Sequence, residues 1–404
     1  MGRSLLAIIL IAASNVAFGQ APWYSLPPAP QTGLAISPPV GVQIELLSGV
    51  YPAMTVVASR ASNPLRTENG EPDTIVWYWP SIVYRTSVGR HEAQIGYSGI
   101  FKRYQKFDDQ DTDNQIVDAG LDLDISERLD VNLQTVLAEG SETRGAPGTP
   151  LPLFPLEDPN EFDSRSYFAE AIYGRRTNTI QLSGAIVHNE VRYTNNDQQA
   201  RDRDRDSLRG RIYYNVAPST SLFAQARVAD IDYQDPTSVL DNTETAGFLG
   251  VLWEATEATF GEAMIGRLDK DFNDPSEDDF DGTAALLRAD WLARPFTRVR
   301  LYASRTTEET SDPSASFFVS NLIGAAVEHE FTSRWTGYMY LNRTKDEFSN
   351  DRQDRFTDFG IGFDYDLTRL ISLGVLYGDA KRSSNDPRAD FDDEFVSIIF
   401  SIRR

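Results

Sequence analysis

Repeated alternation between apolar and polar side chains is the feature that most restricts how this chain can fold. From about residue 40 to the end, segments of roughly ten residues carry apolar side chains at every second position, and short and long polar connections separate them in turn. In the clearest hairpin, Val117 to Ile125 alternates in this way, Ser126–Arg128 turns the chain, and Leu129 to Leu137 repeats the pattern. One such hairpin also fits a soluble sandwich, but its repetition along the chain is typical of a transmembrane β-barrel.

The connections between these segments predict the number of strands. Eight are tight turns, such as Val88–Arg90, Ser126–Arg128 and Thr368–Arg369, and nine are longer, the longest running from Glu139 to Ser164. We therefore predict an all-β, up-and-down antiparallel transmembrane barrel of about eighteen strands, with short periplasmic turns and long extracellular loops. Sixteen strands remain an alternative, because alternation is weak in the first strand and near Arg165–Tyr173.

The start of the chain has the three parts of an export signal. Arg3 supplies a positive charge, Leu5 to Ala13 forms a short apolar core, and Ala17 to Gly19 is a small-x-small cleavage site before Gln20. We assign residues 1–19 to a signal peptide, 20–39 to a proline-rich periplasmic lead-in and 40–404 to an outer-membrane barrel. No later window has the roughly 18 to 20 consecutive apolar residues of a membrane helix, so we expect the chain to cross the membrane with strands.

Composition and motifs exclude several other classes of protein. The chain has no cysteine, which excludes disulfides and thiolate metal sites, and its formal net charge of −22 argues against nucleic-acid binding. Much of the acid lies in the long connections, where it keeps the surface solvated. The sequence also has no glycine-rich phosphate loop, no nucleophile elbow and no HExxH motif, so we predict that the protein is not an enzyme and carries no cofactor.

Aromatic residues near strand ends are expected to form the interfacial girdles of such a barrel. They are Trp77, Tyr78, Trp79, Tyr84, Tyr97, Tyr173, Trp291, Trp335 and Tyr377. The last strand, with apolar residues from Val396 to Ile402, resembles the C-terminal insertion signal of these barrels, although it ends in Arg403-Arg404 instead of an aromatic residue.

The chain resembles a family of outer-membrane β-barrel porins often found with exopolysaccharide synthesis genes. The resemblance covers roughly Val40 to Arg404 and rests on Pro72–Pro80 (PDTIVWYWP), on Gly89–His91, and on the closing segments Asp364–Gly374 and Arg382–Asn385. It implies a channel in the bacterial cell outer membrane, in contact with lipid and lipopolysaccharide. It also implies a periplasmic polysaccharide export protein as partner and a polysaccharide as substrate. No catalytic residue is implied.

Projecting the alternation onto the barrel wall gives a lumen lined by two charged strips. The candidate basic strip consists of Arg209, Arg211, Arg227, Arg288, Arg298 and Arg300. The candidate acidic strip consists of Asp118, Asp122, Asp124, Asp358, Asp364 and Asp366. A basic strip would steer an anionic sugar polymer. The alternative is that these charges pair with one another, because a barrel interior must satisfy its charges.

Uncharged residues share the inward side of the strands. Tyr213, Phe223 and Tyr302 lie on the same side as the arginines, where their rings can either contact sugar rings or fill space. Glycines share the polar face of strands such as Asp358–Asp366, which fits a wall that faces water. The long connection from Glu139 to Ser164 either folds inward as a constriction or stands outside the barrel.

Two further candidates are weaker. Asp269 to Asp281 begins like a calcium loop, but it lacks the turn glycine and has Phe280 at position twelve, so we interpret it as a solvated loop and predict no metal. His188 with Glu190, near the outer end of a strand, is the one arrangement that an outer-membrane enzyme could use, and a lone histidine there is usually an interfacial polar residue.

These patterns lead to three hypotheses about function. The first is an outer-membrane channel for exopolysaccharide secretion that acts with a periplasmic export protein. The second is a general or substrate-selective porin for small solutes. The third is a plugged barrel that anchors other components of the cell envelope.

Overall fold

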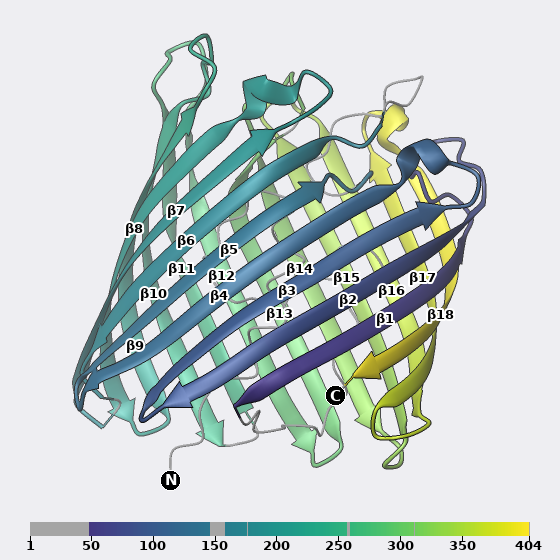
Figure 1. Cartoon of the computed structure of the whole chain (residues 1–404). Helices are drawn as coiled ribbons and strands as arrows, with labels where there is room; N and C mark the ends of the chain where they lie inside the picture. The colour runs from purple at the N-terminus through teal and green to yellow at the C-terminus, as the bar shows by residue number, and fades with distance from the viewer. Residues whose placement is uncertain (1–47, 146–157, 176, 257–258, 311, 404) are drawn as a thin grey trace.

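In a computed structural model, the protein is a closed barrel of eighteen antiparallel strands (Figure 1). The structure describes residues 48–403 except 146–157, 176, 257–258 and 311, so the predicted signal peptide and lead-in lie outside the described residues. The strands are β1 (Gly49–Ala61), β2 (Asp73–Val88), β3 (His91–Tyr104), β4 (Thr112–Ser126), β5 (Leu129–Ser141), β6 (Glu161–Tyr173), β7 (Ile180–Tyr193), β8 (Arg203–Ala217), β9 (Thr220–Tyr233), β10 (Asn242–Thr256), β11 (Thr259–Phe272), β12 (Phe280–Arg294), β13 (Thr297–Glu309), β14 (Phe317–Glu330), β15 (Trp335–Phe348), β16 (Gln353–Asp366), β17 (Ile371–Ser384) and β18 (Phe391–Arg403).

Each strand pairs with its neighbour in sequence, and β18 closes the barrel by pairing with β1 from Ala53–Arg403 to Ala61–Phe395. Closure leaves neither end of the sheet as a free edge, which a structure in lipid requires because no water is present to bond exposed backbone groups. The prediction of an eighteen-stranded barrel is confirmed, and the two weak segments are the regular strands β1 and β6. Within the described residues, no helix has the length and apolar character needed to cross a membrane.

The two ends of the barrel differ as the sequence predicts. The eight tight turns lie at the end where β1 begins and β18 ends, and the long loops lie at the opposite end (Figure 1). The described parts of those loops contain three short 3-10 helices: η3 (Asp108–Gln110), η4 (Gln198–Arg201) and η5 (Pro387–Ala389). Because bacterial barrels have short periplasmic turns, the long-loop end is the outer one.

The outer face of the wall is apolar and exposed, as expected for contact with lipid. Leu249, Ile265 and Ile323 are each more than 60% exposed, whereas the side chains that alternate with them face the interior. Six of the predicted girdle aromatics also lie on the outer face, including Tyr173 and Trp291. This band would be unfavourable in water and matches a bilayer.

Two of the predicted girdle residues lie on the opposite side of the wall. Trp77 packs against a buried inner cluster that includes Val57 and Tyr340, and Trp79 donates a hydrogen bond from Nε1 to Ser98 Oγ at 2.6 Å. The alternation within Trp77-Tyr78-Trp79 explains the difference, because only the middle residue shares the outward side of β2.

Inward glycines accommodate aromatic rings rather than water. A Cβ atom at Gly324 would lie 1.9 Å from Tyr302 Cζ, and one at Gly360 would lie 2.4 Å from Tyr340 Cε1. The rings therefore lie over the glycines of the neighbouring strands, which stabilises a curved sheet. At Gly360, on a strand whose glycines were interpreted as part of a wall that faces water, the ring of Tyr340 covers the glycine instead.

The outer end of β13 separates from β12 while it stays paired with β14 up to Glu309–Phe317. Pairing between β12 and β13 ends at Ala285–Arg305, although β13 continues to Glu309. Beyond that point Thr307 Oγ1 donates to Glu244 Oε1 at 2.9 Å, and Glu309 accepts a hydrogen bond of 2.8 Å from the hydroxyl of Tyr233. Since these partners belong to β10 and β9, the end of β13 leans across the inner side of those strands.

Candidate functional site

The six arginines of the basic strip lie on the inner wall, and each contacts a carboxylate. Arg209 contacts Glu170 at 2.6 Å, Arg211 and Arg288 contact Glu262 at 2.9 and 3.0 Å, Arg227 contacts Glu244 at 3.0 Å, Arg298 contacts Asp290 at 3.0 Å, and Arg300 contacts Glu328 at 3.4 Å. Every one of these arginine side chains is less than a third exposed. We call this arrangement from β6 to β14 the ion-paired belt. The belt matches the alternative stated in the sequence analysis, in which charges inside the barrel pair with one another.

The acidic partners were not identified from the sequence, although a signal for them existed. Glu262 lies directly opposite Arg288 in the β11–β12 pairing, and Asp290 lies directly opposite Arg300 in the β12–β13 pairing. Opposite charges at facing positions on one side of a sheet attract each other. A register worked out from the tight turns would have revealed both pairs.

A second ionic cluster closes the outer end of the belt. Glu244 is 1% exposed and contacts Arg205, Arg227 at 3.0 Å and Lys270 at 3.5 Å. Lys270 is fully buried and also contacts Glu309 from the leaning end of β13. The β13 end is therefore held against β10 and β11 by charge as well as by hydrogen bonds.

The three candidate lumen aromatics accompany the belt. The rings of Tyr213 and Phe223 lie 5.8 Å apart, and the guanidinium of Arg211 lies over the Phe223 ring at 4.1 Å. Tyr302 lies over Gly324 and is 7% exposed. In this state Phe223 is covered by a cation instead of facing an open channel.

The acidic strip is not brought together with the basic one. On β4, Asp118 accepts a hydrogen bond from Gln94 at 3.4 Å and Asp122 accepts one from Asn132 at 2.7 Å. Asp124 on the same strand lies 3.4 Å from Arg90. On β16, Asp358 accepts a hydrogen bond from Asn342 at 3.4 Å, and Asp366 lies 3.6 Å from Arg403. Asp364 is the sixth member of the strip and also lies on β16. β4 and β16 lie on either side of β1, away from the belt, and amides satisfy several of these carboxylates.

The long loops enclose a vestibule of about 790 Å³ at the outer mouth. Residues from seven connections and from the ends of β9 and β17 line it, among them Arg66, Arg144, Arg201 and Arg382. Arg201 holds Glu142 of the β5–β6 connection. Burial acts to raise the pKa of that carboxyl, but the charge and hydrogen bonds of Arg201 outweigh it and lower the pKa.

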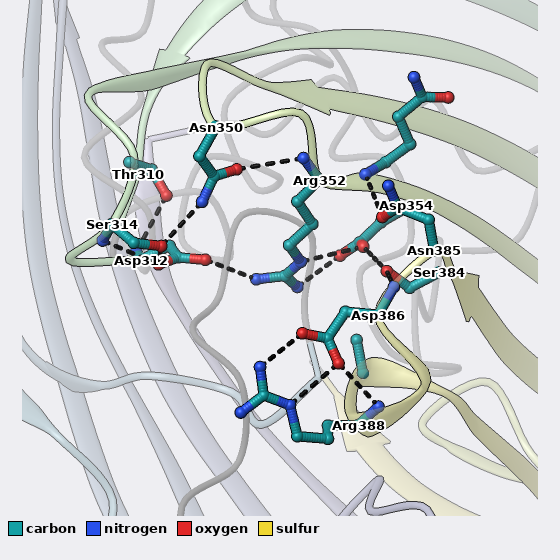
Figure 2. Close-up of polar contacts among 12 residues, drawn as sticks. Thr310, Asp312, Ser314, Asn350, Arg352, Asp354, Ser384, Asn385, Asp386 and Arg388 are labelled. Carbon is teal, nitrogen blue, oxygen red and sulfur yellow. Dashed lines mark hydrogen bonds and ion pairs between the residues drawn. The ribbon is translucent and has the colours of Figure 1, made fainter.

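Arg352 connects the loop after β13 to the start of β16. It donates hydrogen bonds of 3.0 Å to both Asp312 and Asp354, and Ser384 also donates to Asp354 at 2.6 Å (Figure 2). Burial acts to raise the pKa of Asp312, but hydrogen bonds from Ser314 and Arg352 outweigh it and lower the pKa. Ion pairs and hydrogen bonds of Arg201 and Arg352 thus hold the loops around the vestibule together.

The two weaker candidates have structural roles. His188 faces outward between Glu190 Oε1 at 3.1 Å and Asp206 Oδ1 at 2.8 Å, away from the lumen. In the β11–β12 loop, Asp274 accepts hydrogen bonds from Ser276 and thereby shapes the turn. Among the residues that the structure describes, no group of three or more histidine, aspartate or glutamate side chains is placed to hold a metal ion.

The closed wall, its lipid-facing band and its charged interior define a bacterial outer-membrane β-barrel of the porin class. The chain belongs to the family described as "Putative beta-barrel porin 2", which matches residues 49–404. No curated protein sequence matches it.

Solved outer-membrane proteins match most of this chain at low sequence identity. OpdK of Pseudomonas aeruginosa is 9% identical, with 89% of this chain and 100% of that chain covered and a TM-score of 0.47. OpdO of the same species is 11% identical, with coverage of 88% and 97% and a TM-score of 0.48. A bacterial polysaccharide outer membrane secretin is 12% identical, with coverage of 87% and 98% and a TM-score of 0.36.

Proposed function

We propose that this barrel is a transport protein, not an enzyme, and that it carries an anionic exopolysaccharide across the outer membrane together with a periplasmic polysaccharide export protein. The ion-paired belt is the observation that supports this proposal. Its arginines span strands β8 to β13, and their partners are carboxylates, the same group that an acidic sugar presents.

An acidic polymer can move along such a belt by exchange. When a sugar carboxylate takes the place of Glu262 or Asp290, the arginine keeps a charge-assisted hydrogen bond, and the displaced side chain turns to water. Because the belt is paired at rest, the lumen side chains stay buried until polymer arrives. This state restricts leakage of small solutes through an outer-membrane channel.

The periplasmic end offers a contact surface for the partner. The tight turns and adjoining strand ends expose apolar side chains at Val88 (71%), Phe296 (57%), Phe331 (60%) and Leu370 (52%). Apolar side chains at turns that face an aqueous compartment favour a protein contact. We assign this surface to the export protein.

A substrate-selective porin for small solutes is the second candidate. The vestibule of about 790 Å³ has the size of a pocket for one small ligand. A porin of this kind would bind its solute there and have no effect on polymer secretion. A plugged anchor, the third candidate, would transport neither polymer nor small solutes.

Deletion of the gene tests the proposed function. We expect secreted polymer to fall to background while polymer accumulates in the periplasm, because the outer membrane then lacks its conduit. Polymer would be quantified in cell, periplasmic and medium fractions, with outer-membrane integrity and small-solute uptake as controls. Unchanged secretion with impaired solute uptake would favour the porin instead.

A further inference from the structure

We propose that the outer wall carries a binding site for the phosphate groups of lipopolysaccharide, formed by Arg343, Lys345, Arg355 and Lys381. We call these four residues the wall cluster. They lie on three adjacent strands, β15, β16 and β17, and all four share the outward side of the wall. The site is independent of the lumen and of the proposed export function.

The pairing places like charges against one another. Lys345 lies directly opposite Arg355, and Arg343 lies opposite Thr357, one pair further down the same ladder. Like charges at facing positions destabilise a sheet unless something offsets their repulsion. In a protein with a net charge of −22, a group of four cations on neighbouring strands therefore indicates a site for an anionic ligand.

Two of the cations are available to a ligand. Lys345 contacts Glu347 and Lys381 lies 3.1 Å from Asp392, but among the described residues no carboxylate lies within 4 Å of Arg343 or Arg355. Both arginine side chains are exposed. Planar guanidinium groups bind phosphate oxygens in a bidentate manner.

Three other outward arginines of the outer half differ in this respect, because each contacts a carboxylate. Arg103 contacts Asp113 at 2.5 Å, Arg165 contacts Glu190 at 3.4 Å, and Arg267 contacts Asp281. Each of these is already neutralised by its own strand or a neighbouring one. The wall cluster thus differs from these three arginines because two of its guanidinium groups lack a carboxylate partner within the described part of the chain.

The height of the cluster fits a lipid headgroup. Leu341 precedes Arg343 on the same side of β15 and is 50% exposed, and Ile361 on β16 is 40% exposed. Arg343 lies eight residues beyond Trp335, and at roughly 3.3 Å per residue and a tilt of about 40° this is about 20 Å above the periplasmic end of the strand. Acyl chains would pack on the apolar band while the phosphates meet the cluster.

Outer-leaflet lipopolysaccharide is the ligand that satisfies both requirements. Free inorganic phosphate would use the cations but gain nothing from Leu341 and Ile361. A phosphorylated lipid uses both, and the long-loop end of the barrel faces the leaflet that contains lipopolysaccharide. We therefore commit to the lipid as the occupant.

The test compares lipopolysaccharide binding to the purified full-length barrel in detergent. For R343A/R355A we expect affinity to fall by about tenfold or more, because charge-assisted hydrogen bonds are lost. The matched control R165A/R267A also removes two outward arginines and should bind as the wild type does. R343K/R355K should recover part of the affinity. Heat-modifiable gel mobility verifies folding of each variant.

A measurement on the wild type needs no variant. Dephosphorylated lipopolysaccharide should bind about tenfold or more weakly than the intact lipid, and millimolar inorganic phosphate should not displace the intact lipid. Equal binding of both lipids would overturn the proposal. So would an R343A/R355A variant that binds like the wild type, a control variant that loses as much affinity, or full displacement by inorganic phosphate.

Discussion

The Glu244→Gln variant is expected to lower the free energy of unfolding of the barrel by about 3–5 kcal/mol. Glutamine keeps the size of the side chain, but it removes the one charge that faces Arg205, Arg227 and Lys270 together. Lys270 would keep its contact with Glu309, while Arg205 and Arg227 would each lose a buried charged partner. Removing one partner of a buried ionic cluster is costly because the others stay desolvated.

Urea titration of the barrel in lipid vesicles would measure this effect. Glu190→Gln is the matched control, because Glu190 contacts Arg165 and His188 on the outer face and its side chain is 25% exposed. We expect the control to change the unfolding free energy by less than about 1 kcal/mol. Equal effects of the two variants would contradict the role of Glu244 as the centre of a buried cluster.

The second large effect concerns conductance. Thr307→Ala combined with Glu309→Ala removes the hydrogen bonds that hold the end of β13 against Glu244, Tyr233 and Lys270. We expect single-channel conductance in a planar bilayer to rise severalfold, because the freed end can return toward β12 and widen the outer lumen.

Arg305→Ala is the control for this experiment. Arg305 lies on the same strand, but its side chain donates to Asn321 at 2.6 Å and to the backbone carbonyl of Thr283 at 3.0 Å. Its conductance should match that of the wild type. If the double variant also conducted like the wild type, the position of the β13 end would not limit conductance.

The sequence predicts the wall of this protein better than its interior. Alternation and turn spacing suffice for eighteen strands because each hairpin is a local feature, and the period of two assigns each side chain to a face. The same logic places all six basic-strip arginines on the inner wall. It fails at Trp77 and Trp79, since proximity to a strand end does not determine the face.

Interactions between distant strands could not be predicted in this way. Arg211 on β8 meets Glu262 on β11 by crossing two intervening strands, and Glu309 on β13 reaches Tyr233 on β9. Neither contact follows from the pairing of neighbouring strands, because the first depends on the curvature of the wall and the second on the separation of β13 from β12. The ion-paired belt and the cluster around Glu244 therefore depend on the tertiary structure of the barrel.

The central claim is that polymer passes through the lumen lined by the ion-paired belt, and thiol blocking tests it most directly. The chain has no cysteine, so Arg298→Cys introduces a single reactive thiol at an inward position whose native side chain is 29% exposed. Exopolysaccharide release would be measured from living cells before and after the addition of a thiol reagent that reaches the periplasm. We predict that release stops in the Arg298→Cys strain and continues both in the wild type and in a strain with Leu249→Cys on the lipid-facing side. Continued release from the fully labelled Arg298→Cys strain would contradict the claim.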